Sequence, residues 1–462
     1  MRFKFHTIIL LYCISACSSG DNSASIRNKE AEEGILTPDN FPYVFAEKPS
    51  TGKSIYIPND LQDNNFDSNN SHWSYQRSAS SENVILFWEK GFGQYPSKTA
   101  NTAMQVNIQN LLDSAEKQYV FYRDTLKFVD VGISQSDEYR MMIFLIYQEE
   151  WLATGAGYDN VIGALWINPT TTAYNSVIGH EFGHSFQYQV HCDGNYGFRD
   201  QNYVGTFWEQ CAQFMSWQMN NEDYSQDIPY FLTNAHKNFS HEDIRYQSIY
   251  LMEYWKQKHG MEFLGKVWKE ALEPEHPLQT YKRIAGIDQE QLNDEVFEYA
   301  CKNITWDYPL GSYNREFITS LPISQQLEYE HVTQLNAVED GYYQIAAVQI
   351  PQAYGYNAIK LQVPPTETEV TVEFEGLENE WSSIAGWRWG FVRTLADGKP
   401  VYEEIQKTEL GTTSVTITDN TSELWFVVSG APTEHINHVW DNDDGNDENF
   451  PYRLRFTNTT PE

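Results

Sequence analysis

Basic residues are scarce in this chain of 462 residues. Lys and Arg number 31 against 64 Asp and Glu, so the formal net charge is −33. The sequence contains no run of basic residues that could form a concentrated patch. Because a polyanion is repelled by phosphate backbones, the composition argues against nucleic acid as a partner. The strong acidity favours solubility and says little about the fold.

Long hydrophobic runs are also lacking, apart from a short apolar stretch, Phe5–Ser15, which is too short to cross a bilayer. Arg2 and Lys4 precede it, and Ile14-Ser15-Ala16-Cys17 follows, which resembles a bacterial lipobox. We therefore expect a signal peptide over residues 1–16, a lipid on Cys17 and a polar, flexible tether over residues 17–40. The alternative is an ordinary signal peptide with an incidental cysteine. The lipoprotein interpretation places the chain in a bacterial envelope, at the periplasmic or cell-surface face of the outer membrane.

Cysteine is rare as well, with five in the whole chain. Cys13 belongs to the predicted signal and Cys17 to the predicted anchor. The remaining three, Cys192, Cys211 and Cys301, are odd in number, so at least one is free or paired between molecules. Cys192 and Cys211 could pair with each other. Their spacing excludes a CxxC metal site.

The first half of the chain mixes predicted strands and helices. Apolar runs predict buried strands at 84–88, 141–147 and 161–168, and helical spacing predicts a helix over 102–123. A further helix is expected at about 172–190, followed by a mostly helical region at 205–305. We expect one α+β domain over 41–320, with a mixed sheet and one helix in 41–190 and a helical half in 191–320.

After residue 320 the periodicity changes to two. Val370, Val372 and Phe374 alternate with polar residues, and further short strands are expected at 424–428 and 452–457. This pattern predicts an all-β sandwich over 325–462. Trp387, Trp389 and Phe391 alternate along one predicted strand, which favours a place in its core over a sugar-stacking surface.

The clearest motif is His180-Glu181-Phe182-Gly183-His184. On a helix, residues four apart lie on one face at roughly 6 Å, so both imidazoles can reach one zinc ion. Glu181, beside the first histidine, can hold the water that zinc activates and take its proton. The neighbouring residues are uncharged, so this helix can be buried. The motif predicts a zinc-dependent hydrolase, and the alternative is a helix whose histidines serve only packing or solvation.

Catalytic zinc takes three protein ligands and leaves one position open. A third histidine at the spacing of the extended motif would fall at Val190, which cannot bind metal. His191 lies two turns beyond His184 and would need a sharp break to return. Glu209 comes 25 residues after His184, where a second helix can fold back over the first. We favour Glu209, although its position also suits a glutamate in the first turn of a helix.

These residues resemble the zincin metallopeptidases, and within them the gluzincins, whose third ligand is a glutamate. The HEFGH segment at 180–184 and the later Trp208-Glu209 carry the resemblance, which covers about residues 80–320. The closest resemblance is to a secreted zincin-like family of unknown function. It implies zinc at His180, His184 and Glu209, with Glu181 catalytic. It also implies a zincin-like catalytic domain whose strand before the motif helix, 161–168, lines the cleft and pairs with a peptide substrate.

The chain departs from that pattern in one respect. Many gluzincins carry an aspartate four residues after the third ligand, which orients a zinc-bound histidine, and here that position is Gln213. An amide can still accept a hydrogen bond but raises the ligand's basicity less.

An oxyanion donor is expected from the segment around 239–250. We select Tyr246 as a second catalytic residue, because a hydroxyl there could donate to the developing oxyanion. The alternative is that Tyr246 and Tyr250 are packing residues four apart on a helix.

An acidic loop near the C-terminus is a candidate calcium site. Asp441, Asp443 and Asp447 alternate around Gly445, a spacing that resembles oxygen-rich Ca²⁺ loops. The glutamate of an EF-hand is absent, because the twelfth position is Tyr452. A solvated acidic loop before a strand is the alternative.

Together these features predict a monomeric, lipid-anchored zinc peptidase that cleaves extracellular protein or glycoprotein. Two alternatives stay open. One is a surface lipoprotein with little or no turnover that binds protein or glycan through its β-sandwich. The other is a zinc hydrolase of non-peptide substrates.

Overall fold

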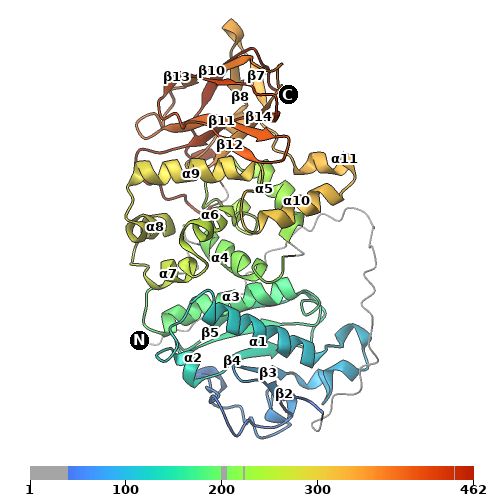
Figure 1. Cartoon of the computed structure of the whole chain (residues 1–462). Coiled ribbons are helices and arrows are strands. Elements are labelled where there is room, and N and C mark those ends of the chain that lie inside the picture. The colour runs from blue at the N-terminus through green and yellow to red at the C-terminus, as the bar shows by residue number, and fades with distance from the viewer. Residues whose placement is uncertain (1–39, 199–204, 222–223, 442) are drawn as a thin grey trace.

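The structure is a computed structural model that describes residues 40–198, 205–221, 224–441 and 443–462. Three regions follow one another along the chain: a mixed sheet with two long helices, a layer of helices, and a pair of antiparallel sheets (Figure 1). The chain thus has a mixed α+β architecture, as predicted, with β-rich regions at both ends and helices between them.

The first sheet has six strands, in which β3, β4 and β6 run parallel and the remaining pairs antiparallel. Its order is β1 (Val44–Phe45), β2 (Ser78–Ser80), β3 (Val84–Trp88), β4 (Met141–Leu145), β6 (Ile162–Ile167) and β5 (Ala153–Tyr158). Every residue of β3 and β4 is buried, as expected for strands whose apolar runs are covered on both faces. The strands predicted at 84–88, 141–147 and 161–168 are confirmed.

Two long helices pack on this sheet and on each other. Helix α1 (Ile108–Asp124) lies over β3, and α3 (Asn175–Cys192) lies over β5 and β6 (Figure 1). Asn107 caps α1 by accepting a hydrogen bond from the Asn110 N–H. Helix α3 is the predicted motif helix, and most of its residues are buried.

The edge strand β5 is not among the predicted strands, and its composition explains why. Its residues read Ala-Thr-Gly-Ala-Gly-Tyr, with little of the β-branched and aromatic character that marks strands. The small residues are required by packing, because a Cβ on Gly155 would lie 2.0 Å from the backbone oxygen of Glu181. Because β5 packs so closely on α3, it requires small residues, and its sequence lacks the β-branched and aromatic residues by which strands are predicted.

The middle layer consists of α4 to α11. Their bounds are α4 (Gly205–Trp217), α5 (Ile228–Asn234), α6 (Tyr250–His259), α7 (Phe263–Lys269), α8 (Pro277–Ala285), α9 (Gln289–Asn303), α10 (Gly311–Ser320) and α11 (Ile323–Gln326). The mostly helical region predicted at 205–305 corresponds to α4–α9. Before α6 the chain forms a 3-10 turn at Glu242–Ile244, and the α-helix itself begins at Tyr250. It ends at Gly260, whose φ of 103° suits glycine.

The C-terminal region contains two antiparallel sheets. One has the order β13-β10-β15-β8-β7 and the other β12-β11-β14-β9. Their bounds are β7 (Leu335–Ala337), β8 (Tyr343–Ile345), β9 (Tyr356–Leu361), β10 (Glu369–Gly376), β11 (Trp387–Leu395), β12 (Pro400–Tyr402), β13 (Leu410–Thr416), β14 (Thr421–Gly430) and β15 (Tyr452–Thr457).

Aromatic side chains join the two sheets. Phe374 of β10 stacks on Trp389 of β11 with ring centroids 4.9 Å apart. Trp387, Trp389 and Phe391 are all buried, so their interpretation as core residues is confirmed. Helix α9 packs against β11 and β14 and connects this region to the helical layer (Figure 1).

Among the described residues, no disulfide joins Cys192, Cys211 and Cys301 to one another, so the suggested pairing of Cys192 with Cys211 is not present. Within the described residues, no helix combines the length and the apolar character needed to cross a bilayer.

Candidate metal centre

The two motif histidines lie on one face of α3, as their spacing predicts. Both are buried, and their rings are nearly perpendicular, with centroids 4.5 Å apart and an interplanar angle of 87°. Helix α4 packs closely over this face at Gly183, where an added Cβ would lie 3.2 Å from the Cα of Ala212. The glycine inside the motif thus brings α4 near both imidazoles.

Glu209 on α4 completes the group. Its Oε2 lies 3.0 Å from Nε2 of His180 and 3.2 Å from Nε2 of His184. Ligands of tetrahedral zinc at about 2.0–2.1 Å stand roughly 3.3 Å from one another. The three groups therefore fit a divalent ion in both their chemistry and their spacing. Burial raises the pKa of Glu209, but the two histidines outweigh it through charge and hydrogen bonds, so the net pKa is lowered.

Two glutamine amides fix the orientation of the histidines. Oε1 of Gln213 lies 2.7 Å from Nδ1 of His180, and Oε1 of Gln187 lies 2.7 Å from Nδ1 of His184. The amide nitrogens donate to backbone carbonyls, Gln187 to Trp208 and Gln213 to Tyr246. The oxygens must then face the imidazoles, so each Nδ1 carries the hydrogen, and the lone pairs of each Nε2 and of Glu209 are left for an ion that the three groups could share. The sequence singled out Gln213 but gave no signal for Gln187.

Glu181 is buried beside these ligands and does not join them. Burial is the main reason why its pKa is raised to about 7, and the charge of Glu209 adds to the effect. The nearby His180 and a hydrogen bond from the Gly155 backbone act in the opposite direction. A carboxyl whose pKa lies near neutrality can both take and release a proton at working pH.

Tyr246 faces the same space as Glu181. Both line a cavity together with His180, and the ring centroid of Tyr246 lies 5.9 Å from that of His180. Burial raises the pKa of Tyr246 to about 12, so its hydroxyl keeps its hydrogen near neutral pH. The structure brings this residue beside the motif, whereas Tyr250 is buried in α6 away from the cavity lining.

The strand expected to line the cleft must be corrected. Residues 161–168 form β6, which is hydrogen-bonded on both sides, to β4 and to β5. An inner strand has no free edge for a peptide, so this role cannot belong to it. The free edge belongs to β5, where Ala153 lines the cavity and Gly155 donates to Glu181.

The residues of the predicted calcium loop do not converge. Oδ1 of Asp441 accepts the Asp443 N–H, and Oδ1 of Asp443 accepts the Gly445 N–H. Asp447 is turned inward, where its carboxylate lies 3.4 Å from Nε2 of His241. Among the described residues, the groups of potential metal ligands within 4.8 Å of one another do not include these three together. Cys17, the predicted lipid site, lies outside the described residues.

A second group of potential ligands combines His241, Glu242 and His438. It lies between the helical layer and the loop that precedes β15, and all three residues are buried. Nε2 of His438 lies 3.0 Å from Oε2 of Glu242. A third group, His241 with Asp243 and Asp444, surrounds the Lys237 ammonium, which lies 3.3 Å from Nε2 of His241. The Lys237 ammonium therefore occupies the place of a cation among these side chains.

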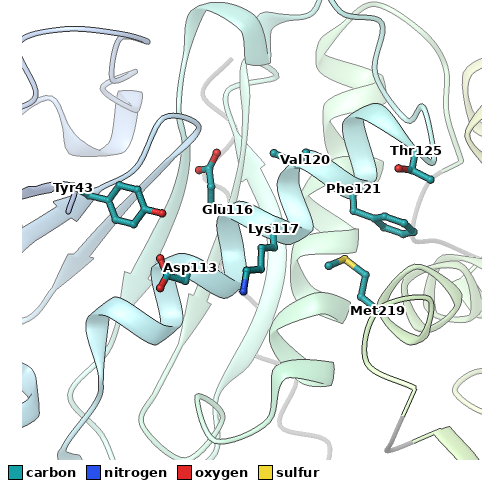
Figure 2. A pocket seen from close by; sticks show the side chains of 8 residues that line it. All are labelled: Tyr43, Asp113, Glu116, Lys117, Val120, Phe121, Thr125 and Met219. Atoms are coloured by element: carbon teal, nitrogen blue, oxygen red, sulfur yellow. The ribbon is translucent and has the colours of Figure 1, made fainter. Parts of the chain in front are cut away.

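A separate hollow of about 420 Å³ lies beside α1 and shares no residue with the lining of the cavity at His180. Figure 2 shows Tyr43, Met219 and side chains of α1 around it. Its carboxylates have structural contacts: Glu116 accepts the Asn83 N–H at 3.1 Å and bonds the Ser81 hydroxyl.

Comparison with known proteins gives a family but no activity. Residues 47–462 match the model of a family of unknown function, DUF6055. Since the match spans nearly the whole chain, the protein belongs to this family. No curated protein matches the chain.

Proposed function

We propose that this protein is a zinc-dependent hydrolase, a metallopeptidase of the zincin type with a gluzincin ligand set. One observation carries the proposal. Nε2 of His180 and Nε2 of His184 converge on Oε2 of Glu209, next to the buried carboxyl of Glu181 and at the wall of an open cavity. Zincin-type peptidases combine these groups, with two histidines on one helix and a glutamate on the next.

Zinc held by these three residues would polarise the substrate carbonyl and make a water acidic near neutral pH. Glu181 accepts the proton as the water oxygen attacks the carbonyl carbon. When the C–N bond breaks, the same carboxyl passes the proton to the leaving nitrogen. The raised pKa of Glu181, about 7, supports both transfers.

Tyr246 and strand β5 complete the proposed site. The Tyr246 hydroxyl, protonated at neutral pH, donates a hydrogen bond to the oxyanion that forms at the carbonyl oxygen. Along β5, Leu152 is hydrogen-bonded inward to Asn168, so the backbone N–H and C=O of Ala153 and the C=O of Gly155 point outward, while the Gly155 N–H donates to Glu181. An extended peptide could pair with these groups as an added strand.

We further propose that the chain acts outside the cytoplasm, anchored by a lipid at Cys17 and working as a monomer on extracellular protein or glycoprotein. The lipobox-like Ile14-Ser15-Ala16-Cys17 segment supports this location.

The test measures bound zinc and protein cleavage in the wild type and in Glu181→Gln. We expect the variant to retain zinc and to lose about 10²–10⁴ in cleavage rate, because the amide cannot take the proton. Glu328→Gln, an exposed change that removes the same charge, serves as the matched control and should cleave at the wild-type rate. Bound zinc without any cleavage that depends on Glu181 would favour a binding lipoprotein. A wild type without zinc would refute every zinc-based interpretation.

A further inference from the structure

The cavity beside His180 has a composition that points to one kind of ligand. Its volume is about 310 Å³, at the small end of the range for ligand pockets, so it suits a single side chain. His180, Glu181 and Tyr246 form the wall next to the candidate metal centre. A side chain in this cavity would therefore belong to a residue close to the bond being cleaved.

The other walls combine aromatic rings with a carboxylate. Trp151, at the start of the edge-strand segment, and Trp217, at the end of α4, contribute two indoles. Asp227 contributes a carboxylate from the 3-10 turn Tyr224–Asp227 that precedes α5. None of the described residues lining the cavity is a lysine or an arginine.

Such walls suit a long cationic side chain. Its methylene groups would pack on the indoles, its charged end would be attracted to their faces, and Asp227 would pair with it. A carboxylate from the substrate would be repelled by Asp227 at the end of the cavity away from the candidate metal centre. The net charge of −33 acts in the same direction, because it draws cationic substrates toward the protein.

We infer that this cavity is a specificity pocket for lysine or arginine, and that the enzyme cleaves peptide bonds next to a basic residue. This inference rests on the proposed peptidase function and adds a substrate class to it. Asp227 is the residue that sets the specificity, and Trp151 and Trp217 hold the side chain.

Turnover tests the inference directly. The mature chain is incubated with matched peptides that carry lysine, norleucine or glutamate at one position, and mass spectrometry locates the cleaved bonds. Cleavage next to lysine should exceed cleavage next to norleucine by about tenfold or more in kcat/KM, as expected for a charge-assisted contact. In Asp227→Asn this lysine-to-norleucine ratio should fall about tenfold, and in Asp227→Lys the glutamate peptide should become preferred.

Asp419→Asn is the matched control. It removes one negative charge from an exposed position of the C-terminal region, so it should leave the lysine-to-norleucine ratio unchanged. An equal fall in both Asp→Asn variants would assign the preference to net charge and overturn the role of Asp227. Cleavage without a preference for basic residues would overturn the inference while leaving the peptidase proposal intact.

A binding measurement separates the two proposals. Calorimetry on Glu181→Gln compares the amides of Nα-acetyl-lysine and Nα-acetyl-norleucine, which differ in the terminal ammonium. Tighter binding of the lysine compound, lost in the double variant with Asp227→Asn, would support the pocket even if the wild type cleaved no peptide. Equal binding of the two compounds, or no binding of either, would overturn it.

Discussion

Two buried clusters of this protein are built from the same residue types but arranged differently. The candidate metal centre contains His180, His184 and Glu209. A second cluster, here termed the junction cluster, contains His241, Glu242, His438 and Asp447. In the metal centre the two rings are at 87° and both Nε2 atoms face one oxygen of Glu209. In the junction cluster the rings are stacked, 26° apart in plane with centroids separated by 4.7 Å.

Stacking changes what the nitrogens can do. An imidazole lone pair lies in the plane of its ring, so stacked rings place their lone pairs in separate, nearly parallel planes, which disfavours their meeting at one ion. Oε2 of Glu242 lies at one edge of the pair, 3.0 Å from Nε2 of His438 and 3.8 Å from Nδ1 of His241. Asp447 lies at the opposite edge, 3.5 Å from Nδ1 of His438 and 3.4 Å from Nε2 of His241.

The lone pair of His241 is also occupied, because its Nδ1 accepts a hydrogen bond from the Asp243 N–H at 3.1 Å. Residue type alone therefore does not distinguish a metal site from a cluster that shares protons. The distinction lies in the angle between the rings and in where the second nitrogen of each ring is bound. The following predictions test this distinction.

Removing a ligand should have the largest effect. His184→Ala and Glu209→Ala should lose essentially all bound zinc, because a catalytic site has three protein ligands and cannot hold the ion with two. His438→Asn should retain about one zinc per chain. Plasma mass spectrometry after dialysis against buffered zinc gives these ratios. Two zinc ions in the wild type and one in His438→Asn would show that the junction cluster also binds metal.

The glutamine partners should have an intermediate effect. Gln187→Leu and Gln213→Leu each remove an acceptor that fixes a histidine tautomer, and we expect zinc affinity to fall about 10–100-fold in each. Competition with a chromophoric chelator measures this affinity. Gln210→Leu is the matched control, since Gln210 is buried on α4 but donates to the Phe239 carbonyl at 2.7 Å instead. An equal fall in all three variants would indicate a loss of packing.

The grouping of His180, His184 and Glu209 in the candidate metal centre could be predicted from the sequence because it depends on local spacing. His180 and His184 are four apart, and Glu209 lies in a recognisable helix that can fold back over theirs, so each position has a meaning before the fold is known. Gln187 could not be assigned, because a buried amide can bond in many directions and only α4 decides its partner. His438 could not be paired with Glu242, which lies 196 positions away in the chain.

The elements of the fold also differ in whether the sequence alone could predict them. Apolar runs predicted β3 and β4 because buried parallel strands require them. Strand β5 escaped prediction because its contact with α3 demands small residues at Gly155 and Gly157, which resemble a loop in sequence. The interpretation of the strand at 161–168 as the cleft strand was wrong for this reason. The resemblance to zincins assigns the cleft to the strand before the motif helix, and with β5 unrecognised no other strand could be considered for the edge.

The smallest predicted effect concerns the pH dependence of the junction cluster. Burial lowers the pKa of His438, but the hydrogen bond to Glu242 and the charges of Asp447 and Glu448 outweigh it, so the net pKa is raised. A raised histidine pKa stabilises the fold below the unfolded value of about 6.5, and this contribution is lost as the pH rises through the folded pKa. Burial also raises the pKa of Glu448, whose contribution changes with pH in the same direction.

His438→Asn should therefore lower the free energy of unfolding by about 1 kcal/mol at pH 6, and by progressively less as the pH rises above neutrality. Urea unfolding at a series of pH values measures this difference. His72→Asn is the control, because the His72 side chain is 62% exposed and its ion pair with Glu89 lies near the surface. A difference that stayed constant with pH would mean that His438 contributes packing alone. A difference that grew with pH would mean that His438 is neutral in the folded protein. Proton sharing would then not explain how the junction cluster differs from the candidate metal centre.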